Sequence, residues 1–210
     1  NVGVVFSKSY LIDSNGVIIG DDYENREYSF RKKCLNSSFI SGDLMFGFLT
    51  YSCVIPNLSS ALIKRDLLAS TGGLSNKYKV ASDWAFWLEL SFTTNFYYIS
   101  KPLNYFRQHP TTIRNVIKFE YQVIELFDIF YDLIKSKNLS GKEKTQLYIG
   151  SNIVWISGLI NNFKVFIITF KPIVKKIASY NKLNLIYLCL CLFKVMKESF
   201  LKRLKFKVKK

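Results

Sequence analysis

Histidine, cysteine, proline and glycine are scarce in this chain of 210 residues, and each scarcity excludes a class of protein. The single histidine excludes zinc fingers and proton relays built from several imidazoles. Cys34, Cys53, Cys189 and Cys191 form no Cys-x-x-Cys pair and are too few for a disulfide scaffold, which favours reduced thiols in the cytosol. With 10 glycines and 4 prolines, collagen-like and low-complexity chains are excluded as well. The remaining composition, 49% hydrophobic and 16% aromatic, predicts a folded protein with one core and an appendage.

Long uninterrupted apolar runs are also missing. Residues 153–170 are broken by Asn161, Asn162 and Lys164, and residues 183–193 are too few to cross a bilayer. We therefore predict no transmembrane helix.

Positive charge is concentrated in the second half of the chain. Residues 1–113 carry 11 basic and 9 acidic side chains, whereas residues 114–210 carry 19 basic and 6 acidic ones, and the formal net charge of the whole chain is +15. This asymmetry indicates an anionic partner for the C-terminal part.

The last residues have the pattern of a basic amphipathic helix. Phe193, Met196, Phe200 and Leu204 share one helical stripe, and lysines occupy the other side: Lys194, Lys197, Lys202, Lys205 and Lys209. Such a helix is suited to an anionic lipid surface, and a helix docked by its apolar stripe on the parent domain is the alternative. Nucleic acid is not expected as a partner, because interleaved base-stacking aromatics and known nucleic-acid-binding motifs are missing.

The first third of the chain predicts a β-hairpin followed by a loop and a helix. Residues 4–13 and 17–20 are β-prone, and the Asn15-Gly16 pair between them suits a tight turn with positive φ angles. Residues 21–27 are polar and predict a solvated loop, and residues 39–49 predict a helix that contributes to the core.

The rest of the chain predicts alternating strands and helices and then two long helices. A short strand and a helix starting near Asp66 and ending at Gly72-Gly73 come first, followed by a helix with Ser82 or Asp83 as its N-cap. Extended segments follow at residues 96–99 and 101–107. Long helices are expected at residues 116–135 and, from a capping box at Ser140, to about residue 163.

Five short motifs follow one another between residues 57 and 109. They are Asn57-x-x-Ser60-Ala61-Leu62-Ile63-Lys64-Arg65, Gly72-Gly73-Leu74, Ser82-Asp83-Trp84 with Trp87-Leu88, Tyr98-Ile99-Ser100-Lys101-Pro102-Leu103, and Tyr105-Phe106-Arg107-Gln108-His109. Upstream, Ile12-Asp13-Ser14-Asn15-Gly16 occupies the hairpin. In this order the motifs resemble the C-terminal half of a family 2 glycosyltransferase catalytic domain, over about residues 2–114.

The resemblance implies an α/β fold of the GT-A type. We expect a truncated GT-A-like mixed sheet with flanking helices, α+β as it stands, in residues 1–114, followed by an all-helical, strongly basic extension in residues 115–210. The Asp-x-Asp motif with which the family binds its metal is absent, and Asn1 runs straight into a strand-like segment. We therefore expect that the donor-binding half precedes this sequence, that it holds most ligands of the divalent ion, Mn²⁺ or Mg²⁺, and that residues 1–210 alone are inactive.

The resemblance also implies roles for individual residues. Asp83 corresponds to the general base, which takes the proton of the acceptor hydroxyl, although its position would equally suit a plain helix N-cap. His109 corresponds to a histidine that approaches the metal or the diphosphate, and a surface-loop histidine is the alternative. Substrate-binding roles are expected for four residues, each with a structural alternative: Trp84, Arg107, Asn57 and Ser60.

The function that these expectations favour is glycosyl transfer. The chain would belong to an inverting enzyme that moves a sugar from a nucleotide-sugar donor to a lipid-linked acceptor or a surface polysaccharide, and it would lie peripherally on the inner, cytoplasmic face of the cell membrane. A non-enzymatic module that binds the membrane surface through the basic tail is the alternative. Donor, acceptor and linkage do not follow from these residues.

Overall fold

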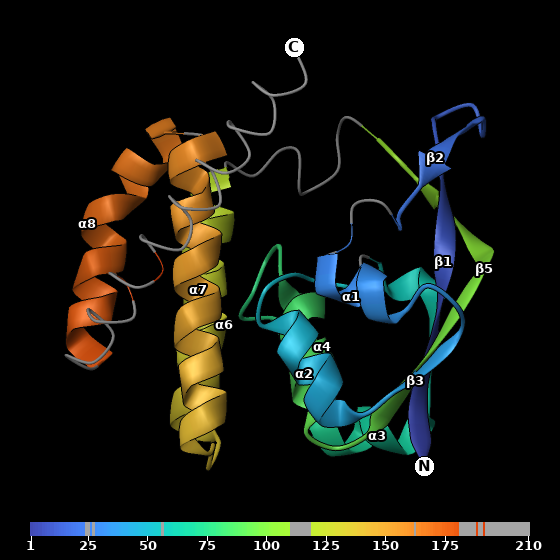
Figure 1. Cartoon of the computed structure of the whole chain (residues 1–210), viewed down its shortest axis with the longest axis horizontal. Coiled ribbons are helices and arrows are strands. Elements are labelled where there is room, and N and C mark those ends of the chain that lie inside the picture. The colour runs from blue at the N-terminus through green and yellow to red at the C-terminus, as the bar shows by residue number, and fades with distance from the viewer. Residues whose placement is uncertain are drawn as a thin grey trace. The chain divides into compact units, whose positions relative to one another are not determined.

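The computed structural model describes residues 1–23, 26, 28–55, 57–109, 119–161, 163–180, 188 and 191. The chain divides into two compact units, residues 1–117 and residues 118–210, and each is described by itself (Figure 1). The expected basic helix of residues 193–209 lies outside the described residues.

The first unit is built on a mixed β-sheet. Its strands are β1 (Val2–Ile12), β2 (Ile18–Asp21), β3 (Ser38–Ile40), β4 (Ala61–Ile63) and β5 (Asn95–Arg107). The strand order is β2-β1-β5-β3, and β4 pairs with the first half of β1. Strands β1 and β5 are parallel, whereas the other pairs are antiparallel. The sheet therefore confirms the α/β class with a mixed sheet.

In the described part of this unit, four α-helices and one 3₁₀ helix accompany the sheet. They are α1 (Tyr28–Lys33), α2 (Gly42–Leu49), η1 (Leu58–Ser60), α3 (Arg65–Thr71) and α4 (Ser82–Ser91). Helices α1, α2 and α4 lie on the same side of the sheet (Figure 1). There Phe30 of α1 packs 5.4 Å from Phe48 of α2 and 5.2 Å from Tyr98 of β5, measured between ring centroids. These aromatic contacts hold the helices on the sheet.

A close contact joins the start of α2 to the end of α4. A Cβ atom added to Gly42 would collide with the backbone carbonyl oxygen of Ser91, and the backbone N–H of Gly42 donates to Oδ1 of Asn95 at 3.0 Å. Glycine is required here because the two backbones approach more closely than any side chain allows.

Several predicted elements are confirmed, with changed boundaries. The hairpin turns at Gly16 with φ of +86°, and α3 ends at Gly72 with φ of +71°. The two predicted extended segments form the single strand β5, and Pro102 sits where the pairing with β1 shifts register, which is where a strand tolerates proline. The helix expected from residue 39 begins only at Gly42, because residues 38–40 pair with β5.

The prediction of a solvated loop at residues 21–27 is wrong for two of its three described charged residues, Asp22 and Arg26. Both side chains are buried, and Nη2 of Arg26 donates to Oδ2 of Asp22 at 2.9 Å. The guanidinium lies between 5.1 and 5.7 Å from the ring centroids of Phe6, Phe30 and Tyr98. The pairing of Asp22 with Arg26 inside the loop, together with the aromatic faces of Phe6 and Tyr98 from distant strands, draws this segment into the core.

The second unit is helical in its described part. It contains α6 (Phe119–Ser136), α7 (Gly141–Asn161) and α8 (Phe163–Tyr180). The capping box is confirmed, because Oε2 of Glu143 accepts from the backbone N–H of Ser140 at 2.7 Å and Oγ of Ser140 accepts from the N–H of Glu143 at 3.3 Å. Trp155 stacks on Phe166 at 4.9 Å between ring centroids and anchors a common core of the three helices.

In the described part of the chain, none of the helices is long and apolar enough to cross a bilayer.

Candidate functional site

Asp83 lies in the first turn of α4 and is half-buried. The predicted role of Ser82 or Asp83 as N-cap is wrong, because the N-cap is Ala81, whose side chain makes no capping hydrogen bond. Oδ1 of Asp83 instead accepts from the backbone N–H of Trp84 at 2.7 Å. The carboxylate therefore sits at the positive end of the helix dipole, which favours a negative charge.

Trp84 and Trp87 serve the packing of α4. Nε1 of Trp84 donates to the backbone carbonyl oxygen of Leu49 at 2.7 Å and so ties α4 to the end of α2. Trp87 is fully buried in the core. Trp84 is half-buried, and its backbone N–H, rather than its ring, makes the contact with the Asp83 carboxylate.

Asn57 and Ser60 come together in a buried polar cluster with two residues that sequence reasoning missed, Ser9 of β1 and Asn104 of β5. Nδ2 of Asn57 donates to Oγ of Ser9 at 3.3 Å, and Nδ2 of Asn104 lies 3.1 Å from the same oxygen and 3.2 Å from Oδ1 of Asn57. Oγ of Ser60 donates to the backbone carbonyl oxygen of Asn57 at 2.9 Å. These contacts fix the segment before β4 against the two central strands.

Arg107 and His109 lie at the carboxyl end of β5. Nη1 of Arg107 donates to the carbonyl oxygens of Asp13 and Ser14 at 3.0 and 2.9 Å, so its guanidinium fastens the hairpin turn to β5. His109 is exposed, two residues beyond the end of the strand. In open α/β sheets the carboxyl ends of parallel strands are where ligands bind.

The six predicted residues thus fall into separate groups. Asn57 and Ser60 belong to one cluster, Asp83 and Trp84 share the first turn of α4, and Arg107 and His109 follow one another at the end of β5. The roles expected for Asp83 and His109 would require the two side chains to face a common cleft, and that cleft stays a prediction.

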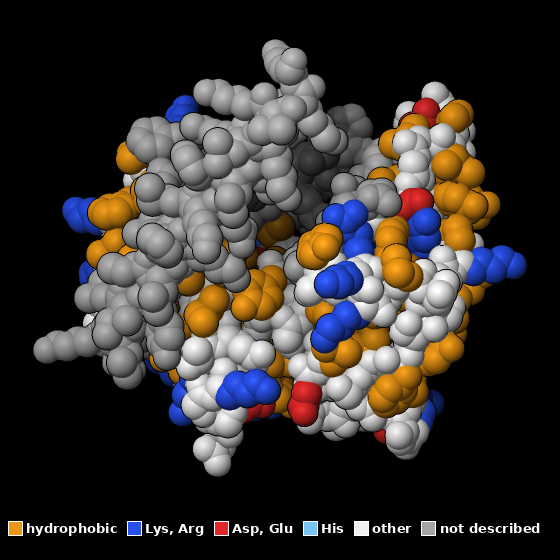
Figure 2. Space-filling view, viewed as in Figure 1, with side chains coloured by type: hydrophobic (Ala, Val, Ile, Leu, Met, Phe, Trp, Pro, Cys, Tyr) orange, Lys and Arg blue, Asp and Glu red, His pale blue; other side chains and the backbone are white. Residues whose placement is uncertain are grey.

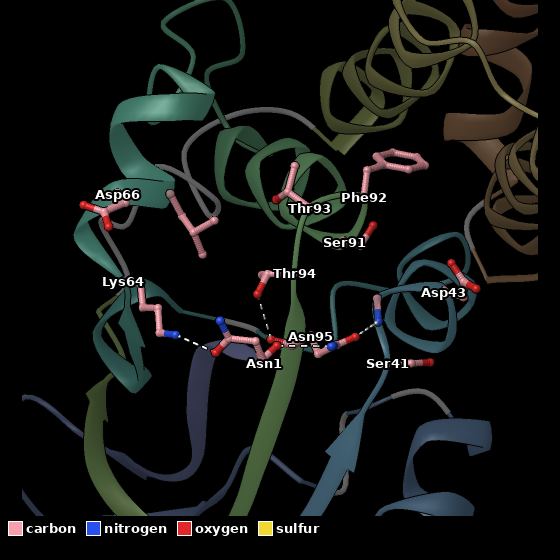
Figure 3. A pocket seen from close by; sticks show the side chains of 12 residues that line it. Asn1, Ser41, Asp43, Lys64, Asp66, Ser91, Phe92, Thr93, Thr94 and Asn95 are labelled. Atoms are coloured by element: carbon pink, nitrogen blue, oxygen red, sulfur yellow. Dashed lines mark hydrogen bonds between the residues drawn. The ribbon is translucent and has the colours of Figure 1, made fainter.

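A polar pocket of about 470 Å³ lies elsewhere in this unit, at the amino ends of β1 and β5 (Figure 3). Nζ of Lys64 donates to Oδ1 of Asn1 at 2.8 Å, and Nδ2 of Asn95 donates to the carbonyl oxygen of Asn1 at 3.1 Å. Asp43 and Asp66 stand on opposite sides of it. None of the six predicted site residues lines this pocket.

Among the described residues of the first unit, Tyr98 and Cys34 have pKa values that depart clearly from their ordinary values. Burial raises the pKa of the Tyr98 hydroxyl far above its usual range, against the opposing effect of the nearby Arg26 charge. Burial also raises the pKa of the Cys34 thiol, again opposed by Arg26. Both groups are therefore neutral at physiological pH and belong to the core around the buried ion pair.

Among the described residues, no three histidine, cysteine, aspartate or glutamate side chains are grouped so as to hold a metal ion. His109 supplies one imidazole, and the described donors do not make a complete divalent-metal site by themselves.

Comparisons with family models, with curated proteins and with solved structures returned no match for this chain.

Proposed function

We propose that the first unit builds the acceptor side of an inverting glycosyltransferase of the GT-A type, with Asp83 as the general base. The proposal is supported above all by the place of Asp83, a half-buried carboxylate in the first turn of a helix whose N-cap is another residue. Asp83 is thus not used as the N-cap of α4.

The chemistry asked of Asp83 is a single proton transfer. The acceptor hydroxyl attacks the anomeric carbon of the donor sugar, the bond from that carbon to the nucleoside diphosphate breaks, and the hydroxyl proton passes to a carboxylate oxygen of Asp83. The helix dipole favours the ionised carboxylate, which is the form that accepts a proton. Trp84 would present an aromatic edge or face to the acceptor sugar beside that carboxylate.

The other predicted residues take supporting roles in this proposal. The cluster of Asn57 and Ser60 with Ser9 and Asn104 holds the acceptor-side segment in position rather than offering unsatisfied groups to a sugar. Arg107 keeps the β5 end in register with the hairpin. His109 remains the proposed contact to the diphosphate or to a divalent ion.

The proposed partners are a nucleotide-sugar donor and a lipid-linked or polysaccharide acceptor at the inner face of the membrane. The basic residues 185–210 would hold the protein on anionic lipid there. Deletion of this segment should move the full-length gene product from the membrane fraction to the soluble fraction, and an unchanged distribution would contradict this location.

Transfer itself is tested by incubating the full-length gene product with radiolabelled nucleoside-diphosphate sugars and a lipid extract of the source cells. We expect labelled sugar to appear in the lipid or polysaccharide fraction. If no donor of a broad panel yields labelled product while the same preparation binds vesicles, the non-enzymatic membrane-binding module becomes the better account.

A further inference from the structure

The outward side of α8 combines exposed lysines with exposed aliphatic side chains. Lys164, Lys171 and Lys175 are exposed. Between them, Ile167 and Ile168 retain relative exposures of 55% and 47%. At the left edge of Figure 2, where Figure 1 shows α8, lysine and hydrophobic side chains lie next to one another. We call these five residues the α8 outer face.

Helix geometry places all five on one side. At 3.6 residues per turn they span an arc of about 100°. The opposite arc carries Thr169, Ile173 and Ile177, which are buried. The isoleucines of the outer face are therefore not part of the core of the three helices, and their exposure is a property of this side of α8.

The charge of α8 is of one sign. Residues 163–180 contain four lysines and no acidic residue. One of them, Lys176, forms an ion pair with Asp128 of α6 inside the unit. The other three are the lysines of the outer face, so three positive charges are gathered around the two isoleucines.

We propose that the α8 outer face lies on an anionic phospholipid surface. Ile167 and Ile168 would enter the boundary between headgroups and acyl chains, and the ammonium groups of the lysines would reach lipid phosphates while their stems cover apolar surface. The helix lies on the bilayer rather than crossing it, because its buried arc stays on the core of the unit. This surface shares its membrane partner with the proposed function, but it rests on neither Asp83 nor residues 185–210.

Other partners fit these residues less well. Single-stranded nucleic acid is bound through aromatic or arginine planes between positive charges, and isoleucine offers no such plane. A second copy of the chain, docked on the same face around a two-fold axis, would bring three lysines against three lysines. Anionic lipid satisfies both the charge and the apolar side chains.

The test is co-sedimentation of the full chain with phosphatidylserine–phosphatidylcholine vesicles across a salt series. Replacing Lys164, Lys171 and Lys175 by Gln should weaken binding at low salt by roughly fivefold per lysine. The double variant Ile167→Ser, Ile168→Ser should lose about tenfold or more at high salt, where charge is screened and apolar insertion remains. Circular dichroism of each variant verifies that the helices persist.

Matched variants in the first unit control for net charge and for exposed apolar area. Ile18→Ser, Ile19→Ser removes an adjacent isoleucine pair of similar exposure, 51% and 58%. Lys32, Lys33 and Lys101, all exposed, are replaced by Gln to remove the same charge. Both control variants should bind vesicles nearly as the unaltered chain does.

Four results would overturn the proposal. The first two are α8 variants that bind vesicles as well as the unaltered chain does, and control variants that lose as much vesicle binding as the α8 variants. The other two are α8 variants that lose RNA binding but not vesicle binding, and self-association of the chain that the Ile167, Ile168 variant abolishes. If vesicle binding is lost only when Lys202, Arg203 and Lys205 are replaced by Gln, α8 is not the lipid contact. The proposed membrane location would still agree with that result. Absence of transfer activity would not bear on either result.

Discussion

The buried ion pair between Asp22 and Arg26 predicts a large and specific loss of stability on Asp22→Asn. Relative exposures of the two side chains are 3% and 1%, so neither charge is screened by water. Oδ1 of Asp22 also accepts the backbone N–H of Ser9 at 3.1 Å, and Arg26 reaches the carbonyl oxygen of Ser7 at 3.2 Å. The pair therefore joins the segment after β2 to the middle of β1.

The size of the effect follows from leaving a guanidinium buried without its counter-charge. Removal of one partner from a buried pair costs about 3–5 kcal/mol. With an m-value of about 2 kcal/mol per molar urea, the midpoint of unfolding should fall by roughly 1.5–2.5 M. Replacing both partners, Asp22→Asn with Arg26→Met, should recover most of the loss, because no uncompensated charge then remains.

Urea unfolding followed by tryptophan fluorescence measures both variants. A Trp155→Phe background confines the signal to Trp84 and Trp87, which lie in the first unit. A loss below about 1 kcal/mol for Asp22→Asn, or a double variant less stable than the single one, would refute the reasoning that the charge pair holds this segment in the core.

Three further predictions concern the packing of each unit. Tyr98→Phe should raise the free energy of unfolding by about 1 kcal/mol at neutral pH, because the buried Tyr98 hydroxyl has no hydrogen-bond partner among the described residues. Burial raises the pKa of Tyr98 in the folded chain, so the unfolded chain releases this proton first, and the contribution of Tyr98 to stability should be full below about pH 10 and fall above it. In a pH series of urea titrations, the free energy of unfolding of Tyr98→Phe should therefore decrease less above about pH 10 than that of the unaltered chain. Gly42→Ala should cost about 1–3 kcal/mol in the same assay, because a Cβ atom there meets the Ser91 carbonyl, and an unchanged midpoint would show that α2 and α4 are not packed so closely. Thr169→Val should cost about 1–3 kcal/mol, because Nε1 of buried Trp155 donates to Oγ1 of Thr169 at 2.9 Å, and thermal unfolding followed by fluorescence of Trp155 should show the loss.

Features encoded by neighbouring residues could be predicted from the sequence. The Asn15-Gly16 turn, the Gly72 helix end and the Ser140–Glu143 capping box each depend on residues a few positions apart, and all three are present. Such signals work because the backbone conformation at a turn or cap is decided locally.

Features that depend on distant partners could not be predicted. Asp22 and Arg26 lie in a polar stretch, and only the rings of Phe6 and Tyr98, brought from elsewhere in the chain, explain their burial. The contact between Ser9 and Asn104 spans 95 positions, and it exists because β1 and β5 are adjacent parallel strands. A single sequence does not reveal strand adjacency of that range.

The central claim is that Asp83 is the base, and its most direct test is the turnover number of the full-length gene product carrying Asp83→Asn. Asparagine keeps the acceptor for the Trp84 N–H but takes no proton, so kcat should fall by about 10²–10⁴ while donor binding is retained. Asp43→Asn and Asp66→Asn are matched controls, because each aspartate also lies in the first turn of a helix. Near-normal turnover for Asp83→Asn, or an equal fall in the two controls, would contradict the account.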